Sequence, residues 1–174
     1  MINEYGAAEP MAAVETEQTT NDDVISCLNG LIQTCRDGQE GFKEAAEGIE
    51  RSDLKSAFYE FSQQRADFAG ILQGLVRSLG GEPETEGSFS GALHRGWIDI
   101  KSAVTGRDEK AILNECERGE DSAKSAYTDA LEMSLPANVA DVVRQQSQAV
   151  QAAHNKVKEM RDSESHNAAS NRGF

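Results

Sequence analysis

Hydrophobic residues recur at alternating steps of three and four along four stretches of this chain, within residues 21–50, 53–79, 108–135 and 138–160. This spacing places them on one face of a helix, and each stretch is long enough for about six or more turns. An average step of 3.5 residues also predicts left-handed, nearly antiparallel packing between the helices. All three prolines, Pro10, Pro83 and Pro136, fall outside the four stretches, as uninterrupted helices require. The pattern predicts an all-α protein with four long helices.

Short breaks group the four helices into two hairpins. Arg51-Ser52 separates the first pair, with Asp53 as the expected cap of the second helix, and Pro136 separates the second pair. We expect Asn138 to cap the fourth helix, because asparagine and aspartate side chains accept hydrogen bonds from the free backbone N–H groups at helix starts.

Both ends of the chain lack a helical period. We expect the first helix to begin at Asn21 or Asp22, which leaves residues 1–20 as an N-terminal tail. The apolar stripe of the fourth helix ends near Met160, and the residues that follow are rich in serine and asparagine. The sequence therefore predicts one bundle domain at residues 21–161 and a C-terminal tail at residues 162–174.

A long crossover joins the hairpins, from Gly80 to Arg107. It contains a fifth amphipathic stretch, with a cap at Ser90 and a stop at Gly106, and its apolar positions are Leu93, Trp97, Ile100 and Val104. About 15 helical residues would span about 22 Å, enough to carry the chain back along the bundle. Hairpin, crossover and hairpin is the connectivity of ferritin-like four-helix bundles, rather than of the simple up-down-up-down form.

Polar and small residues interrupt the stripes halfway along each hairpin. The motif Cys35-Arg36-Asp37-Gly38 in the first helix has a counterpart, Cys116-Glu117-Arg118-Gly119, in the third. Counting back from the turns, antiparallel pairing predicts Gly38 opposite Arg65 and Gly119 opposite His154. A glycine inside a helix costs about 1 kcal/mol relative to alanine, so each glycine indicates a need for space.

A guanidinium inside a bundle needs an anionic partner. The candidates for Arg65 are Glu40, Glu44 and Glu120. We predict a buried polar layer at the middle of the bundle that contains Glu40, Gln64, Arg65, Glu120, Gln151 and His154. The alternative is that the Arg65 head group reaches solvent between the helices.

This layer lacks the donors of a dinuclear iron centre. Such a centre takes a Glu from each of two helices and a Glu-x-x-His motif from each of the other two. Here the corresponding helices carry Gln64-x-x-Asp67 and Gln151-x-x-His154. We therefore expect no cofactor and no catalytic residues, with Glu120 and His154 as weak candidates for a single ion.

The composition also indicates which partners and which cellular location to expect. Of the 174 residues, 38% are hydrophobic and 6% aromatic, and the net charge is −13. This charge disfavours nucleic acid and anionic membranes as partners, and no apolar run approaches the roughly 18 residues of a transmembrane helix. The three cysteines are an odd number, and the N-terminus has no signal-peptide pattern. We expect a cytoplasmic protein with reduced thiols, in which Cys35 and Cys116 act as small buried hydrophobes.

Five motifs that occur in order carry a resemblance to a known family. They are Asp37-Gly38-x-Glu40-Gly41-Phe42, Gln64-Arg65-x-x-Phe68, Leu75-Val76-Arg77-Ser78-Leu79-Gly80-Gly81, Gly91-Ala92-Leu93-His94-Arg95-Gly96-Trp97 and Cys116-Glu117-Arg118-Gly119-Glu120. Together they resemble a bacterial family of ferritin-like four-helix-bundle proteins of unknown function, over roughly residues 24–161. The resemblance implies the ferritin-like fold and a cytoplasmic bacterial protein. It implies no activity.

These observations favour a non-enzymatic bundle, structural or stress-associated, that self-assembles into a homo-oligomer through its surface and tails. The alternative is an iron-related, metal-binding protein with a degenerate site. A third possibility, a small-molecule binder in the polar layer, has no supporting residue.

Overall fold

The computed structural model describes residues 19–85, 97 and 99–170, and these residues form helices and connections without a strand. The helices are α1 (Asn21–Gly48), α2 (Ser52–Ser78), α3 (Ile100–Thr105), α4 (Glu109–Glu132) and α5 (Ala137–Ser170). The prediction of four long helices in two hairpins is confirmed. None of the described helices combines the length and apolar composition needed to cross a bilayer.

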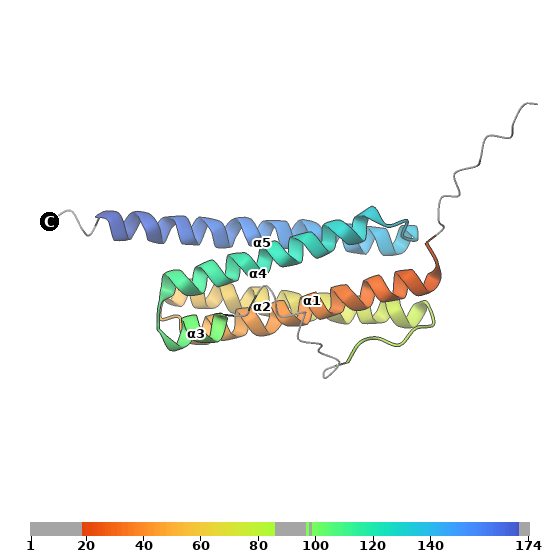
Figure 1. The fold of residues 1–174 in the computed structure, drawn as a ribbon, viewed down its shortest axis with the longest axis horizontal. Coiled ribbons are helices and arrows are strands. Elements are labelled where there is room, and N and C mark those ends of the chain that lie inside the picture. Colours follow the sequence, from red (N-terminus) through yellow and green to blue (C-terminus); the bar gives the residue numbers. More distant parts are fainter. Residues whose placement is uncertain (1–18, 86–96, 98, 171–174) are drawn as a thin grey trace, which may run out of the picture.

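The two hairpins pack side by side along their length (Figure 1). Helix α1 contacts α2 and α4, and α5 contacts α4 and α2, so α2 and α4 lie diagonally opposite each other. The crossover returns the chain to the end of the bundle where α2 began, and α2 and α4 therefore run in the same direction (Figure 1). The short α3 lies against α1 and α4. This is the predicted ferritin-like connectivity.

Local hydrogen bonds fix the ends of the first hairpin. Thr20 caps α1, one residue earlier than predicted. Its Oγ1 accepts from the Asp23 backbone N at 3.1 Å, while the Asp23 carboxylate accepts from the Thr20 backbone N at 2.8 Å; this reciprocal arrangement is a capping box. Helix α2 has no side-chain cap. The predicted cap, Asp53, lies in its first turn and pairs with Arg51 at 2.7 Å.

Helix α5 is longer than the sequence predicts. It continues to Ser170, through most of the stretch assigned to a C-terminal tail at residues 162–174. The extension is polar and largely exposed, so it leaves no apolar period to detect. Ion pairs anchor its start, because Arg161 bonds to Glu117 and Glu164 bonds to Arg51. The expected N-terminal tail lies almost entirely outside the described residues, as do residues 171–174.

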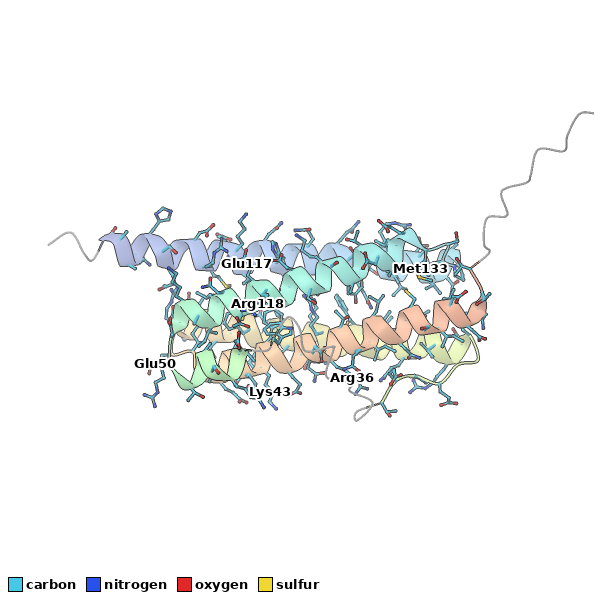
Figure 2. All side chains as sticks on the ribbon, viewed as in Figure 1. Arg36, Lys43, Glu50, Glu117, Arg118 and Met133 are labelled. Atoms are coloured by element: carbon cyan, nitrogen blue, oxygen red, sulfur yellow. The ribbon has the colours of Figure 1, made fainter. Side chains whose placement is uncertain are left out.

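The core consists of two apolar clusters, one toward each end of the bundle. The first includes Leu28, Leu31, Ile32, Cys35, Leu72, Val76, Tyr127, Val139 and Val143. The second includes Phe42, Ile49, Leu54, Phe58, Ile112, Leu113, Cys116 and Val157. Charged side chains such as Lys43 and Glu50 project from the surface (Figure 2). The boundary between the clusters, here called the waist, is where the stripes break.

Trp97 anchors the crossover in a slot between α1 and α4. Its ring is buried and packs edge-on against Phe42, with 5.0 Å between ring centroids. A Cβ atom added at Gly41 would lie 2.2 Å from this ring, and one added at Gly119 would lie 2.1 Å from it. Both glycines are therefore needed because the indole occupies the space that their side chains would fill.

The crossover helix is shorter than predicted within the described residues. Trp97 lies in a turn and α3 begins only at Ile100, although its predicted end at Gly106 is confirmed. The predicted start at Ser90 and the apolar position Leu93 lie outside the described residues.

Candidate functional site

Arg65 occupies the centre of the waist. Its guanidinium comes from α2 and is 1% exposed. Nη2 donates to Glu120 Oε2 on α4 at 2.6 Å, and Nη1 donates to Gln64 Oε1 at 2.7 Å. The pair therefore spans the bundle along its diagonal. A guanidinium this deeply buried does not reach solvent, so the snorkelling alternative is wrong.

Two features of the surroundings accommodate Arg65: a glycine that leaves space for its side chain, and aromatic rings that face its charge. A Cβ atom added at Gly38 would lie 3.2 Å from Arg65 Cγ, so Gly38 does face Arg65 as predicted. The rings of Phe42 and Phe68 lie with their centroids 5.9 and 5.7 Å from the guanidinium carbon. Aromatic faces attract a cation at such distances, and they exclude water from the pair.

The charge of Glu120 depends on Arg65. Burial raises the pKa of Glu120, and the charge and hydrogen bond of Arg65 act in the opposite direction. Among the described residues, Glu120 Oε1 and Arg65 Nε have no hydrogen-bond partner. Each group therefore satisfies only part of the hydrogen-bonding capacity of the other. The loss of either partner would leave the other buried without an opposite charge.

Two residues predicted in the polar layer lie outside it. Glu40 is exposed, because it follows Gly38 by two residues and so points to the opposite side of α1. Gln151 is exposed on α5 and donates to Asn155 Oδ1 at 2.9 Å. Glu44, the third candidate partner of Arg65, instead faces Lys101 at 3.6 Å.

His154 is buried but does not join Arg65. Its Nε2 lies 2.8 Å from Asp121 Oδ1, on the seam between α4 and α5. His154 lies level with Gly119 as predicted, because it meets Glu117 and Asp121, which flank Gly119 on α4, but Trp97 rather than His154 fills the space beside Gly119. The repeated motif in the two hairpins therefore serves two purposes: Gly38 accommodates an arginine of its own hairpin, and Gly119 accommodates the crossover.

A second buried polar group, missed in the sequence, extends the waist. Tyr127 Oη donates to Gln146 Oε1 at 2.7 Å and lies 3.1 Å from Cys35 Sγ. Gln146 interrupts the stripe of α5 between Val143 and Val150, and this polar residue on an apolar face was the signal available. Burial raises the pKa of Tyr127 and raises that of Cys35 to about 11. Both groups therefore stay protonated at neutral pH.

The cysteines are structural. The structure confirms that Cys35 and Cys116 are buried. Burial raises the pKa of Cys116 as well, and nearby Glu120 and Glu115 raise it further. Because the thiolate is the reactive form, these two side chains are small hydrophobes rather than nucleophiles.

The waist does not fit a dinuclear iron centre. Among the described residues, its centre holds the carboxylate of Glu120, the amide of Gln64 and the guanidinium of Arg65. Iron in such bundles takes several anionic oxygens and two imidazoles. Here a permanent positive charge lies bonded to that carboxylate, and it would repel a metal cation.

Comparisons with known proteins agree with this architecture. The family described as Domain of unknown function (DUF2383) matches residues 23–133. Among solved structures, the chain is similar to a dodecameric thioferritin, the bacterioferritin-related protein from Bacteroides fragilis. The two share 14% sequence identity and a TM-score of 0.72, over 88% of this chain and 92% of the other. At this identity the similarity establishes the fold alone. No curated protein matches the sequence.

Proposed function

The chain belongs to the DUF2383 family, and we propose that it is a non-catalytic ferritin-like bundle, structural or stress-associated, that assembles with copies of itself. The observation that carries the proposal is the bond between Arg65 and Glu120, both 1% exposed and 2.6 Å apart. Di-iron bundles build their metal sites in the bundle core from side chains on facing helices, whereas here an ion pair in the core joins the two hairpins.

The first prediction concerns iron. Fe²⁺ added in air to the full chain is expected to show no rapid oxidation at two ions per chain, because the Glu120 carboxylate at the waist is bonded to a fixed cation. Oxygen consumption and absorbance of ferric iron would measure this. The proposal would be contradicted by rapid oxidation that requires two ions per chain and that Glu120→Gln abolishes.

Assembly is supported by exposed hydrophobic residues. The large hydrophobic side chains exposed among the described residues are Tyr59 (46%) and Ile71 (50%), both on α2. They are twelve residues apart, about 18 Å along the helix and about 120° around it, so they form two separate positions rather than one patch. The similar thioferritin is a dodecamer, and we propose that other copies of this chain cover these two positions.

The second prediction concerns the oligomer. Light scattering coupled to size exclusion is expected to give a multiple of the 18.8 kDa chain mass. The double variant Tyr59→Ser/Ile71→Ser is expected to lower the association constant at least about tenfold, because it removes roughly 1–3 kcal/mol of apolar burial per site. Glu60→Ser, which changes an exposed neighbour of Tyr59, is the control. A wild-type monomer at high concentration would remove the assembly claim.

The tails are the other proposed contacts. Deleting residues 1–18 keeps Thr20 and its capping box, so a smaller oligomer in this variant would reflect a lost contact rather than a frayed helix. A cytoplasmic location completes the proposal, since Cys27, Cys35 and Cys116 are all free thiols.

A further inference from the structure

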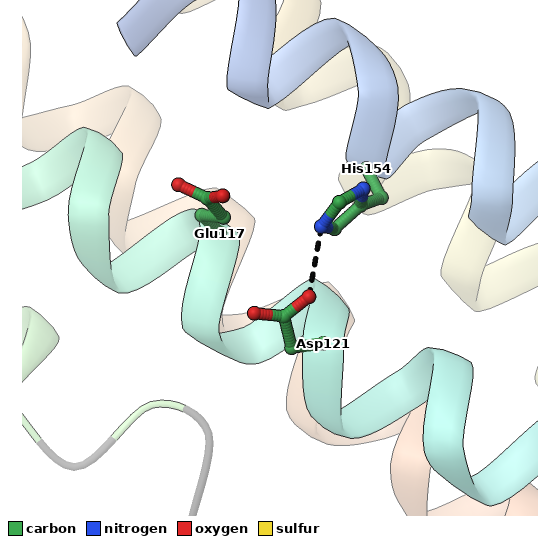
Figure 3. A group of neighbouring side chains, drawn as sticks. All are labelled: Glu117, Asp121 and His154. Carbon is green, nitrogen blue, oxygen red and sulfur yellow. Dashed lines mark ion pairs between the residues drawn. The ribbon is translucent and has the colours of Figure 1, made fainter.

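Three metal-binding side chains meet outside the waist, on the seam between α4 and α5. Glu117 and Asp121 lie four residues apart on one face of α4, and His154 reaches toward them from α5 (Figure 3). One donor atom from each lies within 4.8 Å of the others. We propose that this group, the seam triad, binds a single divalent transition-metal ion of the zinc type.

The donor atoms of the triad are close enough that small side-chain movements would bring them to coordination distances. Zinc bonds imidazole and carboxylate donors at about 2.0–2.2 Å in a tetrahedron, so its donors lie roughly 3.3–3.6 Å apart. His154 Nε2 and Asp121 Oδ1 are 2.8 Å apart and must separate slightly. The remaining separations, at most 4.8 Å, must close by about 1 Å. Asp121 is 60% exposed, so its side chain is free to move, and its side of the triad leaves a fourth position open to water.

The chemistry of the donors selects the metal class. One imidazole with two carboxylates suits zinc, manganese, iron(II) or cobalt, whereas magnesium and calcium take oxygen donors alone. His154 also has a partner for its other nitrogen, because Nδ1 lies 3.5 Å from Asn155 Oδ1. In the structure, Nε2 bonds to the Asp121 carboxylate through a proton. When a metal takes the place of that proton, a proton on Nδ1 would donate to the Asn155 oxygen and leave the Nε2 lone pair for the metal. Gln151 donates to the same oxygen at 2.9 Å and orients it.

An arginine competes for the triad. Arg161 bonds to Glu117 and also donates to Asp162 Oδ1 at 2.8 Å. A metal ion would have to displace Arg161 from Glu117, while Arg161 would keep Asp162. Ion pairs that are partly open to solvent contribute little to stability, so a coordinated ion can displace Arg161 from Glu117.

The seam triad is distinct from the waist. Glu120 is adjacent to Asp121 in sequence, but its carboxylate points inward and bonds to Arg65 at 2.6 Å. Metal binding at the triad therefore leaves the internal pair intact. The proposed structural role and the metal site can be tested independently of each other.

The test is titration of the untagged full chain with Zn²⁺ by calorimetry and with Co²⁺ by visible absorption. We expect one ion per chain. His154→Asn and Asp121→Asn should each weaken binding at least roughly 100-fold, because each removes a direct ligand and even outer partners contribute 10–100-fold. His166→Asn, an exposed histidine on the same helix, is the matched control and should bind as wild type does. Arg161→Gln should bind about two- to fivefold more tightly, since the competing ion pair is gone.

Three results would overturn the inference. The first is the absence of saturable Zn²⁺ and Co²⁺ binding up to ion concentrations on the order of 1 mM. The second is equal binding by wild type and the His154→Asn variant. The third is binding that Asp121→Asn removes and His154→Asn does not, which would mark a nonspecific acidic surface. Circular dichroism checks that each variant folds. If His154→Asn fails to fold, the loss or retention of Zn²⁺ binding in the exposed-site variant Asp121→Asn tests the inference instead.

Discussion

Replacing Arg65 with methionine is expected to lower the free energy of unfolding by about 3–5 kcal/mol. Methionine fills much of the same space, so packing changes little, but the Glu120 carboxylate loses the partner that it holds at 2.6 Å. Glu120 is 1% exposed and cannot turn to water. Urea denaturation followed by circular dichroism measures the loss.

The loss should depend on pH. In the native chain, burial raises the pKa of Glu120 and Arg65 opposes the rise. Without Arg65 the folded-state pKa rises further above its unfolded-state value, so the variant takes up a proton on folding. A buried carboxyl without a cation destabilises the fold least when it is protonated in both states, which is the case below its unfolded-state pKa of about 4.3. Its destabilising effect grows as pH increases through the interval between the two values. The variant should therefore be nearer to wild type at pH 5 than at pH 8.

Two variants control this experiment. Arg65→Met combined with Glu120→Met removes both charges and should recover most of the lost stability, because apolar replacements of buried pairs are often neutral or favourable. Arg144→Met breaks an exposed pair with Asp141 and should change stability by at most about 1 kcal/mol. A single Arg65→Met variant as stable as Arg144→Met would contradict the buried pair.

Replacing Gly119 with alanine is expected to expel Trp97 from its slot. The new Cβ would lie 2.1 Å from Trp97 Cε2, a distance that no small shift can accommodate. Loss of a buried tryptophan lowers the free energy of unfolding by about 3–5 kcal/mol. The higher helix propensity of alanine than of glycine raises it by about 1 kcal/mol. The net loss should be roughly 2–4 kcal/mol. Trp97 is the single tryptophan of the chain, so its fluorescence should shift to the red while the stability falls.

A second glycine provides the matched control. Nothing lies within 4 Å of a Cβ added at Gly70, so Gly70→Ala should stabilise α2 by up to about 1 kcal/mol and leave the emission unchanged. In a Trp97→Ala background the slot is empty, and Gly119→Ala should then be tolerated. Unchanged emission in the single Gly119→Ala variant would show that Trp97 does not depend on this glycine.

The helices and their order could be predicted because they follow from apolar period and proline placement, both of which are local. Arg65 could also be identified, since a charge on an apolar stripe demands an internal partner. Gly38 was placed correctly because it and Arg65 belong to one hairpin, where a short turn fixes the pairing.

The errors arose where distant segments meet. Trp97 enters between the hairpins from the crossover, and no local count could predict that it takes the space beside Gly119. The sequence places His154 in the layer because it neighbours the stripe, yet its Nε2 lies 2.8 Å from Asp121 Oδ1 on the seam between α4 and α5. The polar end of α5 depends on ion pairs with Arg51 and Glu117, which an apolar pattern does not reveal.

The bond between Arg65 and Glu120 also favours one lengthwise alignment of the hairpins. Alanine, valine and leucine stripes repeat, so sliding one hairpin past the other by one helical turn, about 5.4 Å, would bring similar apolar surfaces together again. The same slide would leave the guanidinium facing aliphatic side chains and the carboxylate without its cation. Apolar burial thus makes the bundle compact, and polar contacts between the hairpins, Arg65 with Glu120 and Cys35 with Tyr127, favour its native register.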